Sequence, residues 1–515
     1  MIKRIVLKSR APQFKFQMCL LEDLVPQDHL LRLVDRYIDF DFIKELTSPL
    51  YCHDNGRPAI DPIVLFKMLF VGYIYGIRSE RRLVEEFNVN LAYRWFIGYD
   101  LDDPIPNHST FSQNRRRRFN KHEELEQQIF DRIVEQAIEY GLIDGHYLYT
   151  DSTHIKANTN KRKFQPVIVK DKPMEYLKEL QDDIDQRREE IGKKPFDHDD
   201  DDPNGSTPSS KEHEIKQSTT DPDSGFMTRD GKPQGFFYLD HRTVDGRNNL
   251  IVDCHVTAGN INDARPYPNR LQRIWERFGF NTWCVGVDAG YKTAYIAKFL
   301  QECGVYGVAG YRRKPHRNKD LFYPSEFQYD KQHDLYICPG NKVLKLTTID
   351  RNGYAHYKAK CGTCEQCPLK ARCTRAQYKM ISRHIWQDYV DELDSHRLTT
   401  MGKRIYKRRK ETVERSFADS KEMHGLRYAR YRGLRKVRAQ CLLTAACQNM
   451  KKIALILHRQ DKLFGPRDPN DPNDGLLNLI FRLLQALQNG FWKEISRKVG
   501  ICLKKKEWDD YCPAT

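Results

Sequence analysis

The feature that most constrains the fold is an alternation of strand-like and helix-like patterns between residues 146 and 310. HYLYTD is a short aromatic and β-branched run, GFFYLDHRTVD and NNLIVDCHVTAG flank the turn DGRNN, and NTWCVGVDAG and VYGVAGY are further apolar runs. Helical patterns lie between them, from about 266 to 278 and in TAYIAKFLQECG. The order strand, hairpin, helix, strand, helix, strand predicts an α/β fold with a mixed sheet flanked by helices.

Two aspartates end two of these strand-like runs. Asp151 closes HYLYTD, and Asp288 closes NTWCVGVD. A carboxylate that is buried without a partner costs free energy, so neither is expected to be an ordinary core residue. Taken singly, each could also form a turn or cap a helix. If the two strands are parallel neighbours, the two carboxylates lie side by side, and Mg²⁺ (or Mn²⁺) is a natural partner for such a pair.

A third carboxylate lies in a basic segment that we expect to be helical from about 401 to 424. On a helix, Glu414, Phe417 and Lys421 share one face, because they are three and seven residues apart. Phe417 would anchor the helix to the sheet, Glu414 would complete the metal site, and Lys421 would lie near phosphate. Glu411 is a competing candidate on nearly the same face. A solvated helix with internal ion pairs is the alternative interpretation.

Residues from about 25 to 140 have helical patterns. Pro62 opens the apolar segment PIVLFKMLFVGYIYG, and Ser109 or Thr110 could cap a helix in HSTFSQNRRRRF. Short helices that end in a basic element are typical of a DNA-binding module, although a plain helical bundle has the same pattern. The candidate DNA contacts are Arg115, Arg116, Arg117 and Arg118, together with Lys410 and Arg415 beside Glu414.

The charge of the chain favours a polyanionic partner. Its 515 residues include 86 Lys and Arg against 70 Asp and Glu, a formal net charge of +16. The surplus gathers in clusters such as 312–314, although a soluble basic protein without a nucleic-acid partner could have the same charge. The chain has neither a run of about 18 apolar residues nor a secretory signal, so we expect no membrane span and a cytoplasmic location.

Residues 157–232 differ in composition from their surroundings. The charged helical pattern MEYLKELQDDIDQRREEIG precedes DHDDDDPNGSTPSSKEHE, which is rich in Asp, Ser and Pro. Such a composition predicts a flexible insertion. The acidic run Asp199–Asp202 is therefore interpreted as a solvated loop rather than a metal site.

Five of the 14 cysteines lie close together. Cys361, Cys364, Cys367 and Cys373 form C-x2-C-x2-C-x5-C, and Cys338 lies upstream. In a reducing compartment such a cluster indicates a metal before a disulfide. Four thiolates suit tetrahedral Zn²⁺, with four of the five as ligands, and the ion would help a small insertion to fold. An iron–sulfur cluster or unligated thiols are the alternatives.

Several of these stretches resemble a known family. YTDSTHIKAN, VGVDAGYKT and VERSFADSKEMHGLRYARYRGL look like the three catalytic motifs of DDE transposases of bacterial insertion sequences, in the group with a Tyr/Arg/Glu/Lys signature helix. RPAIDPIVLFKMLFVGYIYGIRSERRLVEEF and NHSTFSQNRRRRF are similar to the helical N-terminal domain of that family. YICPG and CGTCEQCPLKARCT resemble the cysteine-rich insertion of one subgroup.

The resemblance implies an RNase H-like fold and the function of a DNA transposase, an endonuclease and strand transferase. Asp151, Asp288 and Glu414 would bind two Mg²⁺ ions, with Asp151 bridging both, and Lys421 would assist. The implied partner is double-stranded DNA, as terminal inverted repeats and as target, bound by a homodimer associated with the nucleoid. The alternatives are an RNase H-like nuclease without strand transfer and a non-catalytic DNA-binding protein derived from a transposase.

One departure from the signature concerns its spacing. The family pattern is Tyr, two residues, Arg, three residues, Glu, six residues, Lys, and Glu414 and Lys421 match its second half. The first half would place Tyr and Arg at 407 and 410, whereas Tyr406 and Arg409 lie one residue early. Either Lys410 supplies the cation, or the helix contains a local irregularity.

These patterns predict five segments along the chain. They are a helical DNA-binding domain at 1–140, the first part of an RNase H-like catalytic domain at 141–314 with the flexible insertion at 157–232, a cysteine-rich zinc insertion at 315–400, the last part of the catalytic domain at 401–458, and a helical tail at 459–515.

Overall fold

The computed structural model describes residues 19–51, 59–119, 122, 124–170, 176–196, 212–228, 234–311 and 321–464. The chain divides into two compact units, Met1–Ile453 and Ala454–Thr515, and every residue of the candidate site belongs to the first. The second unit is described only as far as Phe464. The basic cluster at 312–314, the acidic run Asp199–Asp202 and most of the expected tail at 459–515 lie outside the described residues.

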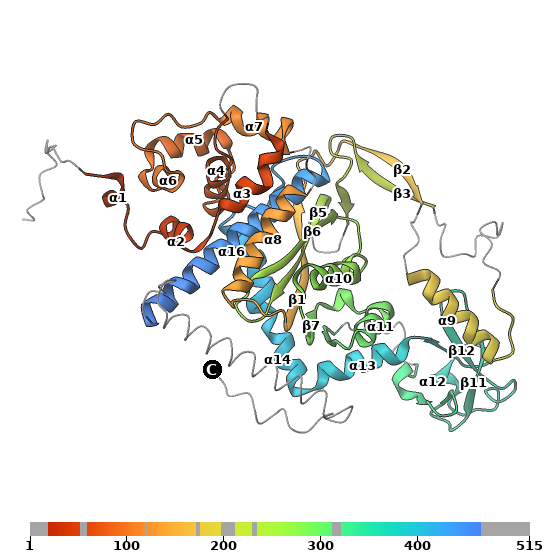
Figure 1. Ribbon diagram of the computed structural model, residues 1–515. Coiled ribbons are helices and arrows are strands. Elements are labelled where there is room, and N and C mark those ends of the chain that lie inside the picture. Colours follow the sequence, from red (N-terminus) through yellow and green to blue (C-terminus); the bar gives the residue numbers. More distant parts are fainter. Residues whose placement is uncertain are drawn as a thin grey trace, which may run out of the picture. The chain divides into compact units, whose positions relative to one another are not determined.

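The N-terminal part of the chain is helical, as predicted (Figure 1). Pro62 begins α4, where the Asp61 carboxylate accepts a hydrogen bond from the backbone N–H of Ile63. The expected cap of α7 is wrong, because the Asn107 side chain accepts from the backbone N–H of Ser109, and the cap therefore lies two residues before Ser109. The helices are α1 (Leu21–Leu24), α2 (Leu30–Tyr37), α3 (Asp41–Thr47), α4 (Pro62–Ile74), α5 (Glu80–Val89), α6 (Leu91–Ile97), α7 (His108–Arg117) and α8 (Leu125–Glu139).

The central sheet has the mixed topology that the strand patterns predict. Its core strands lie in the order β6-β5-β1-β7-β8, where β1 is antiparallel to β5 and parallel to β7. The α/β, RNase H-like fold class is therefore confirmed. These strands are β1 (Tyr147–Lys156), β5 (Gly235–Asp245), β6 (Ile251–Ala258), β7 (Cys284–Val287) and β8 (Tyr306–Ala309).

Helices cover the sheet, and all 11 residues of β5 are buried. The helix α10 (Tyr267–Phe278) follows β6, and α11 (Ala294–Glu302) joins β7 to β8, as a parallel strand pair requires. The long helix α16 (Leu434–Phe464) is fixed to β6 by Asn449, whose side-chain amide bonds both the N–H and the carbonyl of Ile251, at 2.9 and 2.7 Å. The core around the central sheet is thus closed by elements from distant parts of the chain.

The described parts of the expected insertion at 157–232 form strands and a helix, and residues 197–211, which include most of its Asp-, Ser- and Pro-rich stretch, lie outside the described residues. The strands β2 (Phe164–Lys170), β3 (Glu212–Ser218) and β4 (Gly225–Met227) extend the central sheet beyond β5. Seven antiparallel residue pairs join β2 to β3, so backbone hydrogen bonding holds this segment in spite of its polar composition. The charged helical pattern forms α9 (Tyr176–Glu190), as predicted.

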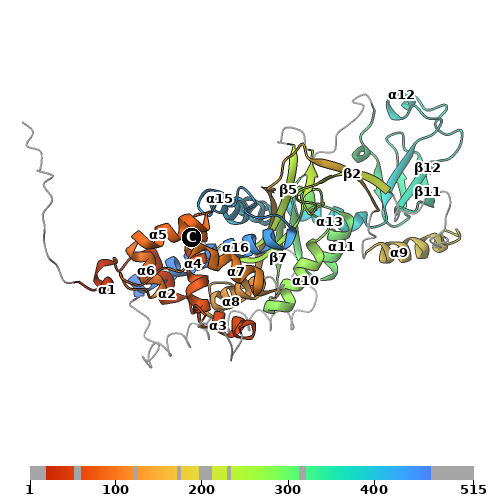
Figure 2. The same cartoon turned by 90° about the horizontal axis from the view of Figure 1, so that it is seen from above.

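The cysteine-rich region contains a second sheet, which is antiparallel and has the order β13-β12-β11-β10-β9. Leu180 and Ile184 of α9 belong to its core, together with Tyr357 and Trp386. Figures 1 and 2 both place α9 beside β11 and β12. Two stretches that were predicted as separate insertions thus share one core. The elements are β9 (Gln328–Asp330), β10 (Leu335–Ile337), β11 (Val343–Ile349), β12 (Tyr354–Ala359), α12 (Lys370–Cys373), β13 (Met380–His384) and α13 (Gln387–Leu398).

The basic segment after residue 400 is helical but not continuously α-helical. It consists of α14 (Thr400–Arg408), a π-helical turn (Lys410–Glu414) and α15 (Arg415–Glu422). None of the helices in the described ranges is both long enough and apolar enough to cross a membrane.

The close approach of β7 to β1 leads to a prediction about the stability of a variant at Gly286. A Cβ atom at this buried position would lie 2.8 Å from Cδ1 of Tyr149, whose ring is itself buried. We expect Gly286→Ala to lower the free energy of unfolding by about 1–3 kcal/mol, since overpacking displaces the ring or the strand. Gly290→Ala is the control, because a Cβ there meets nothing within 4 Å. Thermal unfolding checks this, and equal midpoints for the two variants would contradict it.

Candidate active site

Asp151 and Asp288 lie side by side because of the register between two parallel strands. The pairing of β1 with β7 ends at Thr150↔Val287, so the two aspartates follow directly at the same level. Asp288 ends its strand, as predicted. Asp151 does not, because β1 continues to Lys156 along its antiparallel partner β5. What ends at Asp151 is the pairing with the shorter strand β7.

The Asp151 carboxylate is largely enclosed. Its side chain is 21% exposed, and it accepts a hydrogen bond from the backbone N–H of Ser152 at 2.8 Å. Burial raises the pKa of Asp151 to about 6, Arg409 lowers it, and the neighbouring Asp288 raises it further. The side chain of Asp288 is more open, at 49% exposure.

The Arg409 guanidinium lies between all three predicted carboxylates. Its Nη2 atom is 2.6 Å from Oδ2 of Asp151, and its Nη1 atom is 3.5 Å from Oδ1 of Asp288 and 3.9 Å from Oε1 of Glu414. The arginine is only 3% exposed, and Nη1 also lies 3.4 Å from the hydroxyl of Tyr406. The structure therefore brings Asp151, Asp288 and Glu414 together around one positive charge.

The π-helical turn explains the shifted signature spacing. The N–H of Glu414 donates to the carbonyl of Arg409 at 3.2 Å, a bond that spans five residues instead of four. One extra residue is therefore accommodated between Arg409 and Glu414, and the two share a face. Of the two explanations that the sequence left open, the local irregularity is the one that the structure contains, while Lys410 is exposed.

The competing carboxylate Glu411 is exposed, and among the described residues no ion pair joins it to Arg409. Further along the helix, Phe417 is buried against the sheet, 6% exposed. The ammonium group of Lys421 donates to Oγ1 of Thr153 at 2.5 Å, two residues beyond Asp151 on β1. The predicted common face of Glu414, Phe417 and Lys421 is thus turned toward β1 and β5.

The chemistry of this cluster is that of a cation site. Three carboxylates that converge repel one another unless positive charge lies between them, and here the Arg409 guanidinium supplies it. Within the described ranges, no group of three or more His, Cys, Asp or Glu side chains is placed so that it could hold a metal ion directly. A divalent cation would satisfy the same carboxylates if Arg409 turned toward another anion.

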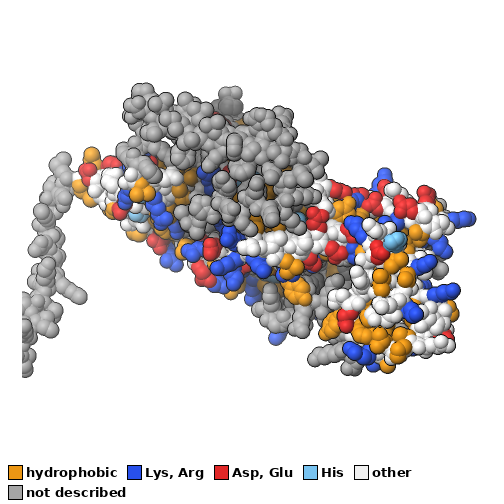
Figure 3. All heavy atoms as spheres, turned by 90° about the horizontal axis from the view of Figure 1, so that it is seen from below, with side chains coloured by type: hydrophobic (Ala, Val, Ile, Leu, Met, Phe, Trp, Pro, Cys, Tyr) orange, Lys and Arg blue, Asp and Glu red, His pale blue; other side chains and the backbone are white. Residues whose placement is uncertain are grey.

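The side chains predicted to contact DNA differ in their exposure and in their interactions within the protein. Arg115 forms an ion pair with Glu80 and lies 4.5 Å from the ring centre of Tyr431, and Arg118 lies 4.3 Å from that of Tyr51. Arg116, Arg117, Lys410 and Arg415 are exposed. On the face shown in Figure 3, Lys and Arg side chains are interspersed with acidic ones. The net charge alone therefore does not locate a DNA interface there.

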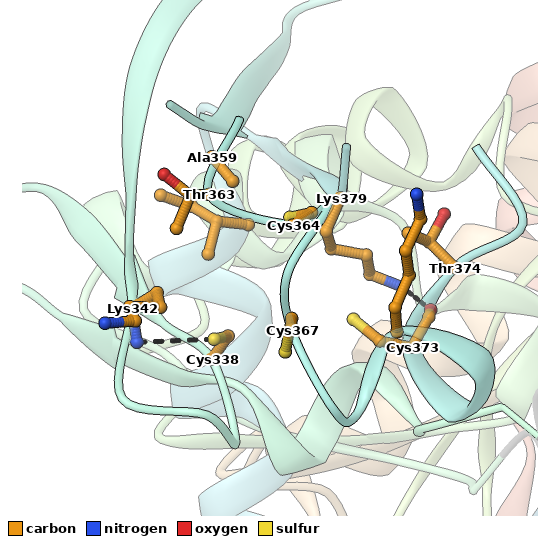
Figure 4. A pocket seen from close by; sticks show the side chains of 11 residues that line it. Cys338, Lys342, Ala359, Thr363, Cys364, Cys367, Cys373, Thr374 and Lys379 are labelled. Atoms are coloured by element: carbon orange, nitrogen blue, oxygen red, sulfur yellow. Dashed lines mark hydrogen bonds between the residues drawn. The ribbon is translucent and has the colours of Figure 1, made fainter. Parts of the chain in front are cut away.

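Four of the five clustered cysteines line one small pocket (Figure 4). Cys338, Cys364, Cys367 and Cys373 surround a cavity of about 20 Å³, and Cys338 Sγ accepts a hydrogen bond from the backbone N–H of Lys342 at 3.3 Å. Burial raises the pKa of Cys373, and the other three thiols raise it further. Cys361 is exposed and does not line the pocket. The structure thus brings four of the five clustered cysteines to one pocket.

Comparison with known proteins agrees with the geometry. Residues 20–117 match the model of a family described as Transposase domain (DUF772), and residues 337–454 match that of a Transposase DDE domain. These two matches support a DDE transposase of the insertion-sequence type. The second match contains Arg409, Glu414 and Lys421, whereas Asp151 and Asp288 lie outside both matches.

A solved structure described as a piggyBac transposase synaptic complex with hairpin DNA matches with 11% identity and a TM-score of 0.29, over 94% of this chain and 90% of the other. That likeness is too weak to support an argument about the site. No curated protein matches the chain significantly.

The ion pair between Arg409 and Asp151 leads to a prediction about the pKa of Asp151. Because the guanidinium lowers that pKa, we expect Arg409→Gln to raise it above about 6 in the metal-free protein. A ¹³C NMR titration of aspartate-labelled protein measures the shift, with the resonance assigned through its loss in Asp151→Asn. Lys410→Gln is the matched control, since Lys410 is exposed and adjacent in sequence. A larger shift in the control than in Arg409→Gln would contradict the prediction.

Proposed function

We propose that this transposase cuts DNA at the ends of an insertion sequence and joins those ends to target DNA at the site formed by Asp151, Asp288 and Glu414. The observation that supports this most is the convergence of the three carboxylates on one guanidinium. They come from β1, from the end of β7 and from the π-helical turn. A plain structural role would not require three such distant segments to place carboxylates together.

The carboxylates would hold one or two Mg²⁺ or Mn²⁺ ions, for which oxygen ligands are the preferred donors. Ions bound there would lower the pKa of an attacking hydroxyl and stabilise the leaving 3′-oxygen. Asp151, which shares Arg409 with both other carboxylates, would be the residue that contacts both ions. Arg409 can exchange these carboxylates for a phosphate, because its planar donors suit either anion. Lys421, on the same helical face, would contact the phosphate backbone.

DNA is the substrate that these groups fit. The exposed Arg116 and Arg117 of α7, and Lys410 and Arg415 beside Glu414, would neutralise phosphates of the terminal repeats and of the target. Cutting and joining two ends would require two copies of the chain, one for each end. The protein would then act in the cytoplasm, on DNA of the nucleoid.

Two alternative functions use the same site differently. A nuclease of this fold would cut without joining, and a non-catalytic DNA-binding protein would do neither. The metal-site carboxylates favour catalysis, because binding DNA alone would not need acidic groups at a phosphate site. An assay that follows strand transfer as well as cleavage separates the three.

Two glutamates that lie three residues apart provide the decisive test. We expect Glu414→Ala to reduce cleavage and strand transfer by at least about a thousandfold, since loss of a metal ligand costs several kcal/mol of transition-state stabilisation. Glu411→Ala should keep the wild-type rate, because Glu411 is exposed and outside the cluster. Cleavage and joining of a duplex that carries the ends of its own element are measured with Mg²⁺ or Mn²⁺.

The cleavage rate of each variant is compared with its affinity for end DNA. Asp288→Ala should abolish cleavage while leaving the dissociation constant for end DNA within about threefold, a difference of less than about 0.7 kcal/mol. Wild-type cleavage without joining would favour the nuclease. Unchanged cleavage in Asp288→Ala or Glu414→Ala would show that the assigned triad is wrong.

We also propose that Cys338, Cys364, Cys367 and Cys373 hold a structural zinc ion. Four thiols around one pocket are the donor set that Zn²⁺ favours. As placed, they line the cavity without forming a coordination group, so binding would draw the loop 361–367 toward Cys338. The ion would then join the β10–β11 turn to α12.

The metal content of purified protein tests the zinc site. We expect about one zinc per chain in the wild type and in Cys361→Ser, and loss of the metal in Cys367→Ser. Elemental analysis measures zinc and iron together, so an iron–sulfur cluster would be recognised at once. Metal-free wild-type protein, or equal loss in both variants, would exclude the assignment.

A further inference from the structure

Arg242 is a fully buried cation in the middle of β5, directly opposite Asp151 in the antiparallel register. Its Nε and Nη2 atoms lie 3.0 and 2.8 Å from Oδ2 of Asp240, which is also fully buried. This short ion pair within one strand compensates the charge of the guanidinium. It also fixes the plane in which the remaining donors of Arg242 point.

The free end of the same guanidinium reaches the helix that follows Glu414. Nη1 donates to Oγ of Ser420 at 2.6 Å and to Oγ of Ser416 at 3.2 Å, and the guanidinium lies 5.2 Å from the ring centre of Phe417. Nη1 also donates to Oε1 of Gln448 on α16 at 3.1 Å. One side chain thus connects β5 with α15 and α16.

These contacts exceed what stability requires. A buried ion pair costs much desolvation, and well-packed apolar side chains of the same volume commonly give equal or greater stability. A rigid guanidinium with donors on two sides, however, fixes the distance between the groups it bonds. Here those groups are β5, at the level of Asp151, and α15, which begins at the residue after Glu414.

We propose that Arg242 is a positioning residue, which sets the place of Glu414 relative to Asp151 and thereby the geometry of the catalytic cluster. This inference rests on the proposed function of that cluster. Arg242 acts through Ser416 and Ser420 and does not touch substrate. Its loss should therefore affect the chemical step rather than the binding of DNA.

Arg270 provides a matched control. It is equally buried, and its guanidinium bonds Asp253 at 2.7 and 2.8 Å and Thr243 of β5 at 3.3 Å. These contacts join α10 to β5 and β6, away from α15. Arg270→Lys therefore removes a buried bidentate pair of the same kind, with a similar effect on stability, but leaves the connection to the Glu414 helix in place.

The experiment compares Arg242→Lys, Ser420→Ala and Arg270→Lys. For Arg242→Lys we expect kcat for cleavage of end DNA to fall about 10- to 100-fold with KM within about twofold, because groups that orient metal ligands have effects of this size. Ser420→Ala should give a smaller loss in the same direction, and Arg270→Lys should keep kcat within about twofold. Native-state hydrogen exchange of residues 415–422 should rise in Arg242→Lys and not in Arg270→Lys.

Hydrogen exchange separates failure of this inference from failure of the proposed function. If the wild type cleaves no DNA, faster exchange of 415–422 in Arg242→Lys but not in Arg270→Lys still supports the positioning role. If Arg242→Lys keeps kcat, or if both arginine variants change kcat and exchange equally, Arg242 is an ordinary core residue and the proposal is overturned.

Discussion

The carboxylate cluster depends on how β1 is paired on its two sides. Along one side β1 is antiparallel to β5 over its whole described pairing, and along the other it is parallel to β7 for only four residue pairs. The end of that short pairing places Asp288 level with Asp151. The same register places Arg242 opposite Asp151, so the strand that carries the first carboxylate also aligns the cation that holds α15.

Positive charge from the protein itself holds the acidic cluster together. Arg409 is nearly inaccessible, yet it faces three carboxylates, two of which are about half exposed. Burial raises the pKa of Asp151 to about 6, so at neutral pH its carboxylate is mainly ionised, and the guanidinium offsets part of the resulting repulsion. Arg409 and the three carboxylates thus interact electrostatically as one group. A change in the charge of one member alters the electrostatic environment of the others.

Much of the fold could be predicted from local sequence patterns, because β5, β6, β7, α10 and α11 are each bounded by a clear change of periodicity. The nearness of Asp151 and Asp288 could be predicted from the assumption of parallel strands. The signature left the role of Arg409 open, and no sequence pattern pointed to Arg242. Asp151, which pairs with Arg409, and Ser420, which pairs with Arg242, are more than 100 residues away in the chain, and no local pattern contains that information.

The structure of the two insertions could also be predicted only in part from the sequence. A polar composition predicted flexibility at 157–232. In its described parts, strand pairing joins β2, β3 and β4 to the central sheet, and the burial of Leu180 and Ile184 packs α9 against the second sheet. The spacing of the cysteines predicted a shared site but left five ligands for four positions. Only the arrangement of the loops around one cavity distinguishes Cys361 from the others.

The π-helical turn has a consequence for how such chains are recognised and how they tolerate length changes. One additional residue between Arg409 and Glu414 is confined to a single widened turn, so the flanking helices keep their faces. A search pattern with fixed spacings between the Tyr, Arg, Glu and Lys positions would reject this chain, although its four signature side chains lie on one face. A single-codon insertion at this point of a helix therefore need not inactivate the enzyme, and the motif is better described by its geometry than by its letters.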